Sequence, residues 1–117
     1  MRRLVLVVAV AALAAGGVAL AASSATMLKL SASKTALKFD KSALKAAPGK
    51  VTIVMANPSF LPHNVAIKGN GAKAVGKIVT KGGISTVSAT LKKGSYTFYC
   101  SVPGHEAAGM KGTLTVG

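Results

Sequence analysis

Cys100, His105 and Met110 are evenly spaced near the end of the chain, in the pattern C-x4-H-x4-M. The cysteine is the only one in the chain, and His105 is one of two histidines. Thiolate, imidazole and thioether groups are soft or borderline ligands, which suit a transition metal. The other histidine, His63, is the one remaining source of an imidazole. These four residues are therefore the candidate ligands of a single metal site.

One cysteine, two histidines and a weakly bound axial methionine make up the ligand set known for blue-copper electron-transfer sites. Zinc is a poorer match, because zinc sites favour cysteine, histidine and carboxylates. Each residue alone has an ordinary structural interpretation, as a core residue or as a histidine at a strand end or in a loop. The joint pattern favours the metal site, and the cofactor we expect is one copper ion cycling between Cu(I) and Cu(II).

Two predicted strands and a loop position three of these candidates. Residues 96–100 are rich in aromatic and β-favouring side chains, and residues 111–116 alternate between apolar and polar. Between them, Pro103 and Gly104 favour a tight turn. A loop held at its two ends, with a histidine midway, can direct three side chains to one point.

The run YCSVPGHEAAGMKGTLTV resembles the copper loop of the cupredoxins, and its C-x4-H-x4-M form is that of auracyanin and rusticyanin. Residues 57–67 are similar to the plastocyanin strand that carries a His-Asn pair. The resemblance covers roughly residues 27–117. It implies a cupredoxin domain whose copper ligands are His63, Cys100, His105 and Met110.

The resemblance also implies two contacts around the ligands. Asn64 should hold the His63 segment to Ser101, the residue that follows the cysteine. Plastocyanin has a proline two residues after its cysteine, whereas this chain has Val102, which keeps its N–H. We therefore expect the Val102 N–H to donate a hydrogen bond to the Cys100 sulfur.

The pattern along the whole chain predicts an all-β fold, a Greek-key β-sandwich of seven to eight strands like that of the cupredoxins. No long helix is expected after the N-terminal leader. The expected strands are residues 27–32, one or two in 36–46, then 51–57, 63–67, a short strand around 77–79 in a glycine-rich loop, 84–91, 96–100 and 111–116.

The N-terminus has the form of a secretory signal peptide. Residues 1–3 are basic, residues 4–20 are apolar and alanine-rich, and small residues up to Ala25 offer cleavage sites. The apolar stretch could also just span a bilayer, so an uncleaved membrane anchor stays open. We expect a signal helix over residues 1–25, a cupredoxin domain over 26–117, and a location outside the cytoplasm, in the periplasm, on the outer face of the membrane or secreted.

Basic residues dominate the charge. The formal charge of +13 falls to +11 without Arg2 and Arg3, which leaves 13 lysines against Asp40 and Glu106. A domain without arginine is a poor match to nucleic-acid binders. The dispersed lysines fit either a solubilising coat or steering toward an acidic redox partner such as a cytochrome or an oxidase. We expect a monomer that meets a membrane only if the leader is uncleaved.

The function predicted from these features is single-electron transfer between proteins, without enzymatic activity. The alternative is a copper chaperone or storage protein, which would exchange metal instead of electrons. A copper enzyme would need a second metal site or an open position, and the chain has no spare histidine. A Cys–His hydrolase would need an orienting third group, and we expect Glu106, the nearest carboxylate, to point away.

Overall fold

The computed structural model describes residues 25–117, which form eight strands and no helix. The strands are β1 (Ala25–Ser31), β2 (Ala43–Ala46), β3 (Gly49–Ala56), β4 (Ala66–Gly69), β5 (Ala72–Val75), β6 (Ile84–Leu91), β7 (Gly94–Tyr99) and β8 (Lys111–Val116). The expected signal helix lies outside the described residues, apart from Ala25 at the start of β1. Within residues 25–117, no helix is long and apolar enough to cross a membrane.

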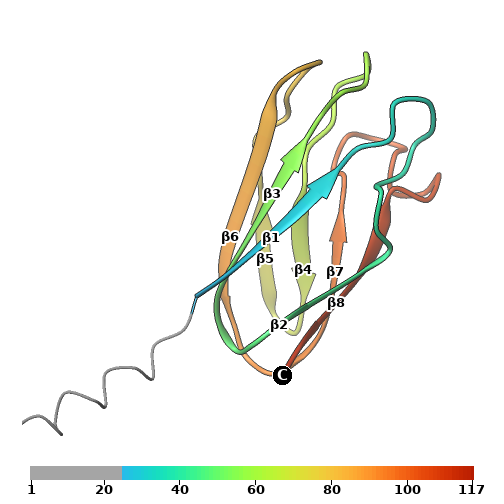
Figure 1. Cartoon of the computed structure of the whole chain (residues 1–117). Helices are drawn as coiled ribbons and strands as arrows, with labels where there is room; N and C mark the ends of the chain where they lie inside the picture. The colour runs from blue at the N-terminus through green and yellow to red at the C-terminus, as the bar shows by residue number, and fades with distance from the viewer. Residues whose placement is uncertain (1–24) are drawn as a thin grey trace, which may run out of the picture.

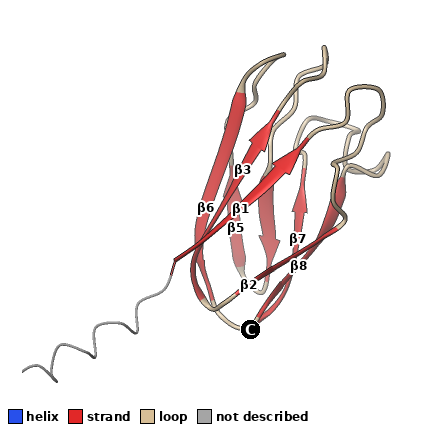
Figure 2. Ribbon diagram, viewed as in Figure 1, coloured by secondary structure: helices blue, strands red, loops and turns tan. Residues whose placement is uncertain are grey.

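The strands form two sheets that face each other as a Greek-key sandwich, as predicted (Figures 1 and 2). One sheet has three strands in the order β1-β3-β6, and the other has five in the order β2-β8-β7-β4-β5. The pairs β1–β3 and β2–β8 are parallel and all other pairs are antiparallel. The chain therefore crosses between the sheets several times, as a sandwich of this topology requires.

Alternating side chains give each sheet one apolar face. In β3, Val51, Ile53 and Met55 are fully buried, while the residues between them are partly exposed. Successive side chains of a strand point to opposite faces, so these three residues line the space between the sheets. Leu114 and Val116 of β8 follow the same pattern from the other sheet. The buried residues form one continuous core that includes Cys100 and Met110.

Two details differ from the strands predicted by the sequence. Of the one or two strands expected in residues 36–46, β2 is the one that forms, and residues 36–40 contribute a bridge between Phe39 and Ala32. The strand expected over 63–67 begins at Ala66, and His63 instead forms an isolated bridge with Val79. Residues 77–79 are otherwise irregular. Their backbone follows the segment that carries His63 without continuing a ladder.

The hairpin of β4 and β5 lies where a loop was expected. Asn70 and Gly71 join the two strands, and both have positive φ angles, 47° and 80°. Two central residues with positive φ make the turn that best matches the twist of a hairpin, and Asn-Gly is its strongest sequence signal. The prediction of a loop was wrong for residues 72–75, because the glycines of residues 68–83 were taken to indicate a loop and not the turn of a hairpin.

Strand pairing brings three segments together at one end of the sandwich. The C-terminal end of β7 lies beside the N-terminal ends of its antiparallel neighbours β4 and β8. Cys100 directly follows β7, Met110 directly precedes β8, and His63 lies three residues before β4. The loops of this end lie together in Figure 1. The segments that carry the candidate ligands therefore lie at the same end of the sandwich because the fold aligns these strand ends.

Gly112 of β8 is the position where the core leaves least room for a side chain. It pairs with Phe98 of β7, and a Cβ atom placed on it would overlap the Phe98 ring and lie 2.6 Å from the carbonyl oxygen of Ser42. We expect Gly112→Ala to lower the free energy of unfolding by about 2–3 kcal/mol, because overpacking forces side chains and backbone to shift. Chemical denaturation of the metal-free protein measures the change.

Two further variants identify the cause. Gly71→Ala has open space around its Cβ but a positive φ, so it should cost only about 1 kcal/mol of backbone strain. Combining Gly112→Ala with Phe98→Leu should cost less than the sum of the two single changes, because the smaller side chain frees space. Strict additivity would contradict the steric explanation.

Candidate metal centre

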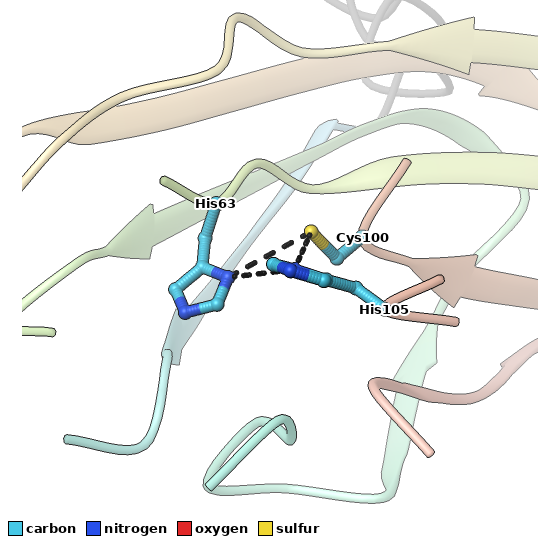
Figure 3. Close-up of side chains that lie close together, drawn as sticks. All are labelled: His63, Cys100 and His105. Carbon is cyan, nitrogen blue, oxygen red and sulfur yellow. Dashed lines mark hydrogen bonds between the residues drawn. The ribbon is translucent and has the colours of Figure 1, made fainter. Parts of the chain in front are cut away.

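Three of the four candidate ligands converge at the end of the sandwich (Figure 3). The Nδ1 atoms of His63 and His105 are 3.2 Å apart. The Sγ atom of Cys100 lies 3.9 Å from Nδ1 of His63 and 3.5 Å from Nδ1 of His105. Both rings thus turn the same nitrogen toward the sulfur. Among residues 25–117, no Asp or Glu side chain belongs to this cluster.

The dimensions of this cluster fit a single metal ion. The triangle with these three sides has a circumscribed radius of about 2.1 Å, so one point in its plane lies about 2.1 Å from every donor atom. For comparison, zinc–nitrogen bonds in proteins are about 2.0–2.1 Å and zinc–sulfur bonds about 2.3 Å, so the space has the size of a first-row transition-metal ion. A thiolate with two imidazoles in a trigonal arrangement suits copper. The residues therefore fit the copper ion that the sequence predicts.

Burial prepares the donors for a metal. Cys100 and His63 are fully buried, whereas His105 is partly exposed. Burial lowers the pKa of His63 below its ordinary value of 6.5, and the neighbouring His105 lowers it further. A lowered pKa keeps the His63 imidazole neutral at neutral pH, which is the form that binds metals. Its Nε2 atom is buried without a hydrogen-bond partner among the described residues.

Backbone hydrogen bonds shape the loop that carries His105. The amide of His105 donates to the Val102 carbonyl at 3.0 Å, and the amide of Met110 donates to the His105 carbonyl at 3.1 Å. At the base of the loop, the Cys100 amide donates to the Met110 carbonyl at 3.1 Å. The Met110 side chain is fully buried in the same core cluster as Cys100. Its sequence-based assignment as the axial ligand stays a prediction.

Asn64 joins the His63 segment to the cysteine segment, as the resemblance implied. Its Oδ1 accepts a hydrogen bond from the Ser101 amide at 2.7 Å, and its Nδ2 donates to Ser101 Oγ at 2.8 Å and to the Gly76 carbonyl at 2.9 Å. The hydrogen bond expected from the Val102 N–H to the Cys100 sulfur stays a prediction. Cys100 Sγ contacts the two histidine rings. The Val102 carbonyl accepts the hydrogen bond from the His105 amide, which closes the turn before His105.

The sequence analysis missed Asn57, which organises the chain before His63. This buried side chain donates from Nδ2 to the carbonyls of Leu61 and Val79, both at 2.9 Å, and accepts from the Ser59 amide at 2.9 Å. An amide can satisfy several backbone groups of an irregular segment at once. The signal in the sequence was the Asn-Pro pair, which was interpreted only as the end of a strand.

Lys68 and Glu106 were also missed as partners. The Glu106 carboxylate binds the Lys68 ammonium group, with oxygen–nitrogen distances of 2.7 and 2.9 Å. Glu106 is therefore paired with Lys68, and the cluster of His63, Cys100 and His105 includes no carboxylate among the described residues. Glu106 is one of only two acidic residues in the chain, and this rarity was a signal that it forms an ion pair. Its partner could not be chosen from 13 lysines by sequence alone.

Asn64 gives a stability prediction that is independent of the metal. Asn64→Ala removes three hydrogen bonds and leaves the buried carbonyl of Gly76 and the partly buried amide and hydroxyl of Ser101 without these partners. We expect the unfolding free energy of the metal-free protein to fall by about 2–4 kcal/mol. Thr52→Ala, which deletes an exposed hydrogen bond to Ser88, is the control and should cost less than about 1 kcal/mol. Equal losses in the two variants would contradict the role of Asn64.

Solved structures of blue copper proteins share this fold. Reduced auracyanin from the photosynthetic bacterium Roseiflexus castenholzii is 26% identical, covers 82% of this chain and 99% of its own, and superposes with a TM-score of 0.70. Auracyanin A from Chloroflexus aurantiacus is 23% identical, with 80% and 100% coverage and a TM-score of 0.70. Amicyanin from Paracoccus versutus is 22% identical, with 78% and 81% coverage and a TM-score of 0.57. No curated protein sequence matches significantly.

The family model "Copper binding proteins, plastocyanin/azurin family" matches residues 26–117, which include all eight strands except the first residue of β1. The match spans every candidate ligand and every loop of the metal-binding end. It agrees with the fold, with the thiolate–imidazole cluster and with copper as the cofactor. This chain therefore belongs to the plastocyanin/azurin family of copper-binding proteins, the cupredoxins.

Proposed function

We propose that this protein is a blue-copper electron carrier that passes single electrons between partner proteins outside the cytoplasm. Its copper ligands would be His63, Cys100, His105 and the axial Met110. The observation that carries the proposal is the convergence of one thiolate and two Nδ1 atoms around a point about 2.1 Å from each. A bound copper ion supplies a one-electron Cu(I)/Cu(II) couple.

The protein framework suits this role because it holds the donors rigidly. Cys100 and Met110 adjoin two paired strands, and Asn64 links the His63 segment to the cysteine segment. A site that is fixed by strands and buried hydrogen bonds changes shape little when its charge changes. Burial of Cys100 and His63 also keeps water from the donors. Small structural change on oxidation and reduction is what fast electron transfer needs.

His105 supplies the route to the surface. It is the only one of the three converging residues that is not fully buried. The loop around it exposes small uncharged residues, among them Gly104, Ala107 and Ala108. A partner can therefore approach the ring edge closely without displacing long side chains. Small, brief interfaces of this kind are typical of redox encounters.

A copper chaperone or storage protein is the second candidate. Such a protein must give up its metal readily, which favours exposed ligands on mobile segments. Here two of the three converging donors are fully buried and their segments are bonded to each other. The geometry therefore favours the electron carrier. It equally favours a non-enzymatic role, because the histidines and the cysteine are all used at one site.

We further propose that the partner presents an acidic surface. The described residues hold 13 lysines, and both acidic residues, Asp40 and Glu106, are paired with lysines. At the metal-binding end, the Lys81 ammonium group lies 3.9 Å from the centroid of the Phe60 ring, which is 82% exposed. An apolar surface with lysines beside it suits a negatively charged partner. A cytochrome or an oxidase with such a face would fit.

The location and the state of the leader complete the proposal. Residues 1–25 have the pattern of a signal peptide, and the domain after it contains one unpaired, buried cysteine. A metal-bound thiolate explains why a lone cysteine persists in an exported protein. We propose export of a monomer, with membrane attachment only if the leader is retained.

The optical and EPR spectra of the Cu(II)-loaded protein test the ligand set. We expect an intense visible band and a narrow copper hyperfine splitting, both arising from the Cys100 thiolate. Cys100→Ser should abolish both features, because a hydroxyl group cannot replace the thiolate as a charge-transfer donor. Met55→Leu is the matched control for changing a buried sulfur residue, and its spectra should be unchanged. A pale spectrum that Cys100→Ser leaves unchanged would exclude the blue-copper proposal and favour metal delivery.

Small redox reagents test the charge of the docking surface. The reduced protein should react with the hexacyanoferrate(III) anion at a rate that falls severalfold as salt is raised, because screening weakens the attraction. A cationic cobalt(III) phenanthroline complex should show the opposite trend. Lys34 lines the same surface hollow as Phe60 and Lys81. Replacing both Lys34 and Lys81 with glutamine should reduce the salt dependence more than replacing Lys92 and Lys93, which precede β7 at the opposite end. Equal effects of the two pairs would indicate a diffuse solubilising charge instead.

A further inference from the structure

Each of the three converging donors is followed in the sequence by a residue that bonds to another segment of the site. Asn64 follows His63 and binds Ser101, which itself follows Cys100. Glu106 follows His105 and binds Lys68 in β4. The first contact ties the His63 segment to the cysteine segment. The second ties the His105 loop back to the strand that His63 precedes.

The Lys68–Glu106 ion pair has the geometry of a defined contact. The ammonium nitrogen lies 2.9 Å from Oε1 and 2.7 Å from Oε2 of the carboxylate. The same nitrogen lies 4.3 Å from the centroid of the Tyr99 ring, which is almost fully buried beside Cys100. Lys68 therefore packs on the cysteine strand while it holds the loop. The aromatic ring restricts where the ammonium group can lie.

The loop has few other connections to the sandwich. Among the described residues, the other hydrogen bonds of residues 102–109 are made within the loop, to Met110 and to the amide of Lys111 at the start of β8, apart from the contacts of the His105 ring with the other donors. Its outermost residues, Ala107 to Gly109, are exposed. Among the described residues, Glu106 is thus the one side chain of this stretch that bonds to a neighbouring strand. Without it, the position of His105 depends on the loop backbone and on the contacts of its ring with the other donors.

We propose that the Lys68–Glu106 ion pair positions His105 at the metal centre. Neither side chain contacts the donor atoms, so both are positioning residues, and their effect on copper rests on the proposed function. By holding the residue next to His105 against β4, the pair keeps the ring nitrogen directed at Cys100 and His63. Loop opening, which is the step that releases a metal, is slower as a result.

The Lys68 and Glu106 variants distinguish a positioning role from a purely electrostatic one. A positioning role gives effects of the same sign in the two variants, and an electrostatic role gives effects of opposite sign. Removing the Lys68 charge leaves an unpaired carboxylate near the metal, and removing the Glu106 charge leaves an unpaired ammonium group. By charge alone, these two changes move the reduction potential in opposite directions, down for Lys68→Met and up for Glu106→Gln. If the pair positions His105, both changes loosen the same loop and act in the same direction on its dynamics.

The experiment compares Lys68→Met, Glu106→Gln and the exchanged variant Lys68→Glu/Glu106→Lys. Lys73→Met is the control, because Lys73 lines the same surface hollow and forms no ion pair among the described residues. Hydrogen exchange of the His105, Ala108 and Met110 amides is measured in the metal-free protein. Copper release to a chelator, the reduction potential and the Cu(II) EPR spectrum are measured in the loaded protein.

Both single variants should speed amide exchange and copper release by about two- to fivefold, the range expected for a partly exposed ion pair. The exchanged variant should restore wild-type rates, and Lys73→Met should leave them unchanged. Unchanged rates in both single variants, opposite changes in the two, or no restoration by the exchange would overturn the proposal. If the loaded wild-type protein lacks the blue spectrum, the proposed function fails, while the metal-free amide exchange still decides the role of the ion pair.

Discussion

The antiparallel pairing of β7 with both β4 and β8 is the constraint on which the metal centre depends. It places the end of one strand beside the beginnings of two others, so that residues far apart in the sequence become neighbours. Cys100 and Met110 adjoin these strand ends directly, and His63 reaches the same point from the segment before β4. A shift of one residue in either pairing would turn the flanking side chains to the opposite face. The apolar core between the sheets prevents that shift, because it would expose Phe98 and Leu114.

In the irregular segments, buried polar side chains supply the hydrogen-bond partners that neighbouring strands supply in the sheets. The chain between β3 and β4 and the chain between β5 and β6 have no regular pairing, yet several of their polar groups are buried. Asn57, Asn64 and Ser85 supply partners for the backbone there, and Ser85 Oγ alone contacts the Lys77 carbonyl and the Val65 amide. Unpaired buried polar groups are costly, so these contacts fix the conformation of the segments. These contacts also fix the position of His63, which lies in one of these segments.

The features that could be predicted are those whose signal lies within a short stretch of sequence. The features that could not be predicted depend on contacts between residues far apart in the sequence. The spacing of Cys100, His105 and Met110 is local, and a loop between two recognisable strands already implies their convergence. His63 was assignable because the chain has no other histidine to offer. The role of Lys68 was beyond prediction, because an ion pair between dispersed charges depends on which strands become neighbours. The bridge of His63 with Val79 and the contacts of Asn57 likewise depend on tertiary structure. The Asn70-Gly71 turn, by contrast, was a local signal that could have been used.

The parallel pairing of β2 with β8 has a consequence for the order of folding. Ala43 is matched with Thr113, so one of the first strands finds its partner only in the strand that follows all the others. Pairing across so long a stretch of chain is slow, because the entropy of closing the intervening loop is lost before the contacts form. The segment from Cys100 to Met110 lies immediately before β8. A partly synthesised chain that lacks β8 therefore cannot close the sandwich, and we expect the sandwich to close and the donors to converge at the same late stage.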